Sequence, residues 1–189
     1  MKIVILGPPG ACKTTVREKV AQKYDLFEVS TGDAFRSEMA QGSEIGKLAR
    51  SFIDKGHLVP DDVTLGVVGA QLEGKENYVL DGFPRTVPQA EAFLVSGENI
   101  DLVLFFDLDF ETAYTRLHSR IAETKAAGGK IRSDDKKEIM HKRFVEFQRK
   151  TSPMKEFFSK KETLVEINAS LDKDGVWQQV QEALFERGF

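Results

Sequence analysis

The feature that most constrains the fold is a short apolar segment that runs directly into a glycine-rich turn and then a helix. Residues 2–6 (Lys-Ile-Val-Ile-Leu) are largely β-branched, as expected of a buried strand. The turn reads Gly7-Pro8-Pro9-Gly10-Ala11-Cys12-Lys13-Thr14-Thr15, and residues 13–24 carry apolar side chains at helical spacing. The motif G-x-x-x-x-G-K-[ST] occurs in this order of strand, turn and helix, and its backbone amides and helix N-terminus surround a phosphate.

Three side chains of this turn have predicted roles. Lys13 is expected to place its charge on the phosphates, and the hydroxyl of Thr14 or Thr15 is expected to meet magnesium or a phosphate oxygen. The alternative is a Gly/Pro turn that opens an ordinary helix. The motif is favoured because strand, loop, lysine and threonine arrive in the required order.

Cys12 departs from the motif, which has glycine before the lysine. If this position needs a positive φ, a Cβ there costs about 1 kcal/mol or more. We therefore expect Cys12 to weaken an otherwise real site. The same position makes Cys12 a candidate reactive thiol, because helix N-termini and nearby lysines favour thiolates. A buried, inert cysteine is the alternative.

Strands and helices alternate along the rest of the chain. Further strands are predicted at residues 26–30, 78–80, 102–106 and 164–167. Helices are predicted at residues 13–24, 33–55 with a break near Gly42, 61–73, 87–95, 109–127, 135–150 and 174–187. This alternation predicts an α/β fold with a parallel five-stranded sheet flanked by helices. Residues 121–131 contain Gly128-Gly129 and are expected to form a polar, mobile excursion.

Composition excludes several functional classes. With 189 residues, of which 41% are hydrophobic and 30% charged, the chain suits a single domain with a real core. The net charge of −3 does not favour a nucleic-acid partner, and the apolar runs are too short for a membrane span. The single cysteine excludes an internal disulfide, and no zinc is expected. We expect a cytoplasmic protein without a secretory signal.

Polar residues also follow the second and third predicted strands. Asp81 ends the third strand, where open α/β sheets bind ligands, and it could hold magnesium through water. Asp33, with Arg36 one turn later, follows the second strand. Each acid, like Asp61 farther along, has the alternative of a simple capping or turn role.

Taken together, these segments resemble the adenylate kinases within the nucleoside monophosphate kinase family. The matching residues run in family order over nearly the whole chain: Gly7–Thr15, Ser30-Thr31-Gly32-Asp33 with Arg36, Leu58-Val59-Pro60-Asp61, Asp81-Gly82-Phe83-Pro84-Arg85-Thr86 with Gln89, Arg116 and Arg120, Arg132-Ser133-Asp134-Asp135, and Arg143. The stretch from Asp81 to Thr86 with Gln89 is the most specific. Only 11 residues separate Arg120 from Arg132, which resembles the short-lid type.

The resemblance implies a core of residues 1–29, 60–116 and 134–189, a helical monophosphate-binding lobe of residues 30–59, and a lid of residues 117–133. It implies reversible, magnesium-dependent phosphoryl transfer from ATP to AMP, with a monomeric enzyme and nucleotides as its only partners. The planar fork of arginine suits such chemistry because it holds phosphate oxygens bidentately.

The resemblance also implies roles for individual residues. The ATP site would comprise Pro9, Gly10, Ala11, Cys12, Lys13, Thr14, Thr15, Arg116 and Arg120, with Arg116 against the donor adenine. The AMP site would comprise Thr31, Arg36, Val59, Gly82, Arg85, Gln89, Arg132 and Arg143. The catalytic residues would be Lys13, Arg85, Arg120, Arg132 and Arg143, with Asp134 and Asp135 positioning the lid arginines. Magnesium would be held by Asp81 through water and by Thr14 or Thr15.

Two other functions remain open at this point. A UMP/CMP kinase is one, although Thr31, Gln89 and the stretch around Val59 favour adenine, since an amide pairs with the edge of that base. A nucleotide-binding protein with impaired catalysis is the other, and Cys12 is its motive. The full set of arginines argues against it, because binding alone does not need them.

Overall fold

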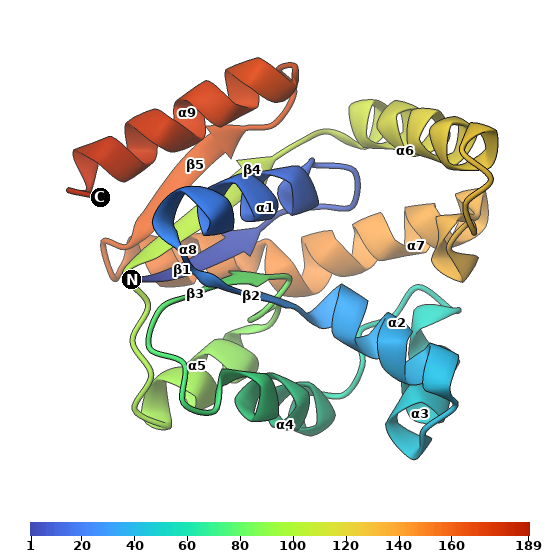
Figure 1. The fold of residues 1–189 in the computed structure, drawn as a ribbon, viewed down its shortest axis with the longest axis horizontal. Helices are drawn as coiled ribbons and strands as arrows, with labels where there is room; N and C mark the ends of the chain where they lie inside the picture. Colours follow the sequence, from blue (N-terminus) through green and yellow to red (C-terminus); the bar gives the residue numbers. More distant parts are fainter.

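The computed structural model covers residues 1–189 and contains one sheet of five parallel strands in the order β2-β3-β1-β4-β5 (Figure 1). The strands are β1 (Lys2–Leu6), β2 (Phe27–Ser30), β3 (Tyr78–Asp81), β4 (Leu102–Asp107) and β5 (Leu164–Asn168). In the centre of the sheet, Ile5 of β1 pairs with Asp81 of β3 on one side and with Leu104 of β4 on the other. The predicted parallel α/β sheet is confirmed.

The central strands β1, β3 and β4 are apolar on both faces because helices cover both faces of the sheet. Ile3 and Ile5 of β1 belong to one buried cluster, whereas Val4 and Leu6 belong to the other. Successive side chains of a strand point to opposite faces, so a strand buried on both faces reads as a continuous apolar run. This burial is the reason that Lys2–Leu6 can be recognised in the sequence.

Nine α-helices surround the sheet (Figure 1): α1 (Lys13–Tyr24), α2 (Thr31–Gln41), α3 (Glu44–Ile53), α4 (Asp61–Leu72), α5 (Val87–Val95), α6 (Phe110–Ala126), α7 (Lys137–Glu146), α8 (Pro153–Ser159) and α9 (Lys173–Glu186). Val20 of α1 and Val180 of α9 pack on one face of the sheet. Val68 of α4, Phe93 of α5 and Phe158 of α8 pack on the other. The helices cover the two faces of the sheet and leave the carboxyl ends of its strands open.

Helices α2 and α3 form a small lobe beside the sheet, below the connection between α6 and α7 in Figure 1. The lobe has its own core, in which Phe35, Ala49 and Val59 are buried together. The predicted break near Gly42 is confirmed, because Gly42 caps α2 with a φ of 70°. The lobe therefore packs around a separate core and carries residues toward the open edge of the sheet.

Some predicted boundaries are wrong. α6 continues to Ala126, so the excursion predicted from residue 121 is limited to residues 127–132. The helix predicted over residues 135–150 is α7 followed by a π-helical segment, Phe147–Thr151, and α8 was not predicted. Helical periodicity does not register a change from α to π winding. None of the helices combines the length and apolar character needed to cross a membrane.

Candidate active site

A cleft lies at the carboxyl ends of β1, β2 and β3, between the sheet and the lobe. It is lined by most residues predicted for the monophosphate side, together with Lys13 and Pro9 of the turn: Thr31, Arg36, Val59, Gly82, Arg85, Gln89 and Arg143. The parallel sheet brings these residues together because the loops after its strands all leave from the same edge. Their convergence makes this cleft the candidate active site.

The remaining predicted residues do not line this cleft. They are Gly10, Ala11, Cys12, Thr14, Thr15, Arg116, Arg120 and Arg132, and Asp81 is buried at the end of β3 beside it. Thr14 is exposed and Thr15 half-buried at the N-terminus of α1. Five of these residues lie in the turn or at the start of α1, whereas Arg116 and Arg120 lie on α6 and Arg132 directly precedes the segment Ser133–Asp135.

The turn before α1 has the backbone of a phosphate loop. A Cβ on Gly7 would lie 2.6 Å from Cβ of Phe106, so only glycine fits where the turn leaves β1. Cys12 caps α1 with a φ of 60° and a ψ of 18°, the left-handed conformation that glycine adopts freely. Position 12 therefore has the positive φ at which a side chain is unfavourable, and the Cβ of Cys12 costs about 1–2 kcal/mol. Lys13 Nζ donates a 2.7 Å hydrogen bond to the carbonyl of Pro8.

Cations crowd the inner end of the cleft. Burial lowers the pKa of Lys13 from 10.5 to about 8, with Arg85 and Arg143 adding repulsion while Asp81 opposes the shift. Burial likewise lowers the pKa of Arg85 to about 10, against the attraction of Asp81. Beside the cleft, burial and neighbouring arginines, Arg36 first among them, also lower the pKa of Arg132. Such crowding of half-buried cations is typical of a site that binds a polyanion.

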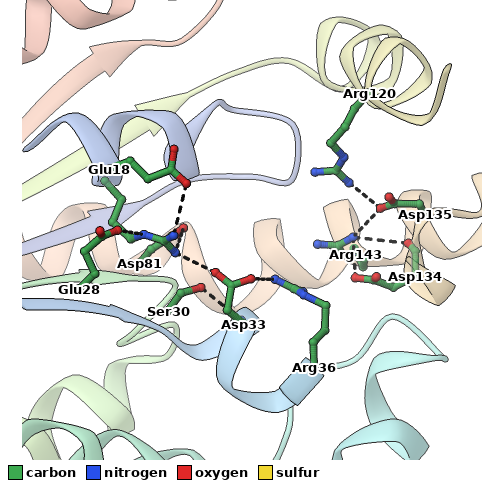
Figure 2. A network of polar contacts seen from close by, with 11 residues as sticks. Glu18, Glu28, Ser30, Asp33, Arg36, Asp81, Arg120, Asp134, Asp135 and Arg143 are labelled. Atoms are coloured by element: carbon green, nitrogen blue, oxygen red, sulfur yellow. Dashed lines mark hydrogen bonds and ion pairs between the residues drawn. The ribbon is translucent and has the colours of Figure 1, made fainter. Parts of the chain in front are cut away.

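Two buried carboxylates hold arginines at the other side of the cleft (Figure 2). Arg120 of α6 donates to Asp135 at 2.5 Å, and Arg143 of α7 lies 2.8 Å from Oδ2 of Asp134. Both acids lie in a short 3-10 turn, Ser133–Asp135, that joins the α6–α7 connection to α7. These contacts are the geometric basis for the expectation that Asp134 and Asp135 position arginines of the lid.

Comparisons with known proteins agree with this arrangement of loop, cleft and arginines. The family model described as adenylate kinase matches residues 5–163. An adenylate kinase of Agrobacterium fabrum is 38% identical over 191 residues, covering 97% of both chains. Adenylate kinases of Nitrobacter winogradskyi and Brucella ovis are 35% and 37% identical, covering 100% and 97% of this chain and 95% and 98% of the relatives.

The chain belongs to the adenylate kinase family. It is therefore a nucleotide phosphotransferase, and the resemblance drawn from its motifs is confirmed. The matched residues 5–163 include the turn, so Cys12 and Thr14 lie within the segment that the family model matches.

Gln89 is held more tightly than its sequence position indicates. Its Nε2 donates to Asp61 at 2.7 Å, and its Oε1 accepts the backbone amide of Arg85 at 2.8 Å. Thr86 also donates to Asp61, at 3.1 Å. Asp61 therefore does more than begin α4, which was its simpler interpretation. A buried amide fixed at both ends presents its remaining donor and acceptor in a single orientation.

Sequence reasoning missed two further charged residues of this adenylate kinase fold. Glu146 lines the cleft from the end of α7, although it is only 6% exposed, and Lys150 approaches it to 2.9 Å. Arg17, which is 8% exposed, lies one turn beyond Lys13 and meets carboxylates on other elements. An i,i+4 spacing from Lys13 was the only available signal for Arg17, and its partners are distant in sequence.

Proposed function

We propose that this enzyme catalyses reversible, magnesium-dependent transfer of a phosphoryl group from ATP to AMP, giving two ADP. The observation that carries the proposal is the convergence of Lys13, Arg36, Arg85 and Arg143 on one cleft from four separate segments of the chain. Phosphoryl transfer needs in-line placement of its reactants and positive charge around the moving group. Nearby Gln89 and Thr31 favour adenine as the acceptor base.

In this proposal each group of residues has one task. Lys13 and the amides of the turn hold the ATP phosphates, and Arg116 lies against the donor adenine. Arg36 and Arg85 hold the AMP phosphate, while Thr31, Val59, Gly82 and Gln89 surround its base. Arg120, Arg132 and Arg143 stabilise the transferring group. The lobe of residues 30–59 and the lid of residues 117–133 close over both nucleotides and exclude water as a competing acceptor.

The residues at the end of β3 fit a magnesium ion that arrives with the nucleotide. Asp81 offers a buried carboxylate whose nearest charged partner, Arg17, is 3.8 Å away, and the hydroxyls of Thr14 and Thr15 lie at the start of α1. Oxygen donors of this kind hold magnesium together with phosphate oxygens and water. The ion would neutralise phosphate charge that the arginines do not reach.

The test is ADP formation from Mg-ATP with AMP, UMP, CMP, GMP or dAMP, using protein whose folding is verified by circular dichroism. Turnover with AMP well above the ribonucleotide alternatives is expected. Preferred turnover of UMP or CMP would instead assign the enzyme to pyrimidine substrates. We also propose a cytoplasmic monomer, which light scattering of the purified enzyme tests directly for oligomeric state.

The φ of 60° at Cys12 favours one second candidate function. Strain and an extra side chain in the turn would leave a protein that binds nucleotides but transfers the phosphoryl group poorly. Folded protein that binds ATP in calorimetry yet forms no ADP with any monophosphate would support this alternative over the kinase.

A further inference from the structure

Arg17 follows Lys13 by one turn of α1 but turns away from the phosphate loop. Its Nε donates to Glu28 of β2 at 2.8 Å, and one terminal nitrogen donates to Asp33 of α2 at 2.9 Å. The same nitrogen lies 3.8 Å from Asp81 at the end of β3. The guanidinium therefore connects the helix of the phosphate loop with the lobe.

Asp33 shares its carboxylate between two arginines. Oδ2 accepts from Arg17, while Oδ1 accepts from Arg36 at 2.6 Å. Figure 2 shows Asp33 between the acids Glu28 and Asp81 on one side and Arg36 on the other. Burial alone would raise the pKa of Asp33, but hydrogen bonds from Arg36 and Arg17 outweigh burial and lower the pKa to about 2. The carboxylate is thus ionised and fully engaged.

The sharing of the Asp33 carboxylate matters to the site because Arg36, one of its two partners, lines the cleft. With Arg17 present, one negative charge is divided between two cations, and Arg36 keeps positive potential toward the cleft. Without Arg17, the carboxylate would turn wholly to Arg36 and neutralise it. The first turn of α2, where the side chain of Ser30 accepts from the amide of Asp33, would also lose its anchor to α1.

We propose that Arg17 is a positioning residue for the monophosphate site, acting through Asp33 on the orientation and free charge of Arg36. The inference rests on the proposed function, in which Arg36 holds the acceptor phosphate. Sequence position alone would assign Arg17 to the ATP side, since it follows the phosphate loop. The geometry assigns its effect to AMP.

The experiment compares wild type with Arg17→Met and Arg17→Lys, and with Arg187→Met as the matched control. Arg187→Met also removes a guanidinium, but the guanidinium of Arg187 donates only to the backbone carbonyls of Glu162 and Leu164. KM and kcat are measured with each nucleotide varied, and AMP affinity is measured separately by calorimetry without ATP. Arg17→Met is expected to weaken AMP about tenfold in both KM and Kd, with KM for ATP changed less than about twofold.

Arg17→Lys keeps the positive charge but loses the fork that reaches Glu28 and Asp33 together. It is expected to restore AMP affinity partly, to within about threefold of wild type. It also carries the test if Arg17→Met does not fold, because it leaves the four neighbouring carboxylates, those of Glu18, Glu28, Asp33 and Asp81, with a cation. Arg187→Met is expected to leave both KM values within about twofold of wild type.

Equal weakening of ATP and AMP, or AMP affinity unchanged in every folded Arg17 variant, would overturn the inference. If AMP is not the acceptor, the wild-type protein itself shows it, because wild type then does not phosphorylate AMP. Wild-type protein that phosphorylates another monophosphate would replace AMP, and Arg17→Met is then expected to weaken that acceptor by the same factor. Wild-type protein that binds no monophosphate overturns both proposals.

Discussion

The guanidinium of Arg116 lies 3.8 Å from the thiol of Cys12, joining α6 to the phosphate loop. The same guanidinium donates to the backbone carbonyls of Ala169, Ser170 and Leu171 in the loop after β5. Glycine at position 12 would make no such contact with Arg116, because it has no side chain. Cys12 therefore acts on this site twice, through its strained backbone and through the arginine proposed to lie against the donor adenine.

Cys12→Gly is expected to raise kcat/KM for ATP about fivefold, by removing about 1 kcal/mol of left-handed strain from the turn. Stability is expected to change little, because the greater freedom of glycine in the unfolded chain offsets the relieved strain. Steady-state kinetics with ATP varied at saturating AMP measures the effect. Equal or lower kcat/KM in folded Cys12→Gly contradicts the prediction.

Cys12→Ala is the matched control, because alanine keeps the Cβ and loses the thiol. If backbone strain dominates, Cys12→Ala remains near the wild-type kcat/KM. An equal gain in both variants would assign the effect to the thiol and its contact with Arg116.

The three central strands were predictable from the sequence because β1, β3 and β4 are buried on both faces. Residues 3–6 and 102–106 appear as uninterrupted apolar runs for this reason. α8 was missed because its seven residues, Pro153–Ser159, directly follow the π-helical segment and are too short to establish a period. Burial on both faces leaves a local signal in sequence, whereas a change of helical winding does not.

The cleft was predictable where one loop carries several site residues, as between Gly82 and Gln89. Arg17 was not, because its partners Glu28 and Asp33 are separated from it by 11 and 16 residues and come together only in the folded sheet. A simple capping role was left open for Asp61, because a position at the start of a helix is enough to explain an acid there. Its bond to Gln89 depends on tertiary packing, for which the sequence carries no local signal.

Lys13→Met is expected to reduce kcat at least about 100-fold and yet to raise Tm at neutral pH. The pKa of Lys13 is about 8 in the folded protein, below its ordinary value of 10.5. The buried charge therefore costs stability in full below pH 8, and that cost disappears as the pH rises toward 10.5. Scanning calorimetry across this range should show the Tm gain of Lys13→Met shrinking.

The control for Lys13→Met is Lys55→Met, because Lys55 is exposed and forms no ion pair. It should change neither kcat nor the pH dependence of Tm. A Tm gain for Lys13→Met that persisted unchanged to pH 10.5 would show that the lysine charge is not its cause.

Asp61→Ala is expected to raise KM for AMP about tenfold and to reduce preference for AMP over GMP and UMP. The reason is that Gln89 loses the carboxylate that orients its amide. Asp62→Ala removes an exposed carboxylate from the same first turn of α4, so both variants lose the same favourable charge at a helix N-terminus. KM values for the three monophosphates measure the difference, and equal values for the two variants would refute a role for Asp61 in base selection.

Ser133 donates a 2.6 Å hydrogen bond to Asp54, which joins the proposed lid to the proposed lobe. Ser133→Ala removes this contact and should make the closed arrangement easier to open. KM for both nucleotides is expected to rise about two- to threefold without a loss of kcat, since opening precedes product release. Ser119→Ala is the matched control, because the Ser119 hydroxyl bonds only to Thr115 within α6.

Asp54→Ala should reproduce the effect of Ser133→Ala, because each variant deletes one partner of the same bond. The double variant should then be no worse than either single variant, because the interaction can be lost only once. Fully additive increases in KM would mean that the two side chains act through separate contacts. A fall in kcat with both KM values unchanged would place Ser133 in the chemical step, and closure of lid on lobe would then depend on other residues.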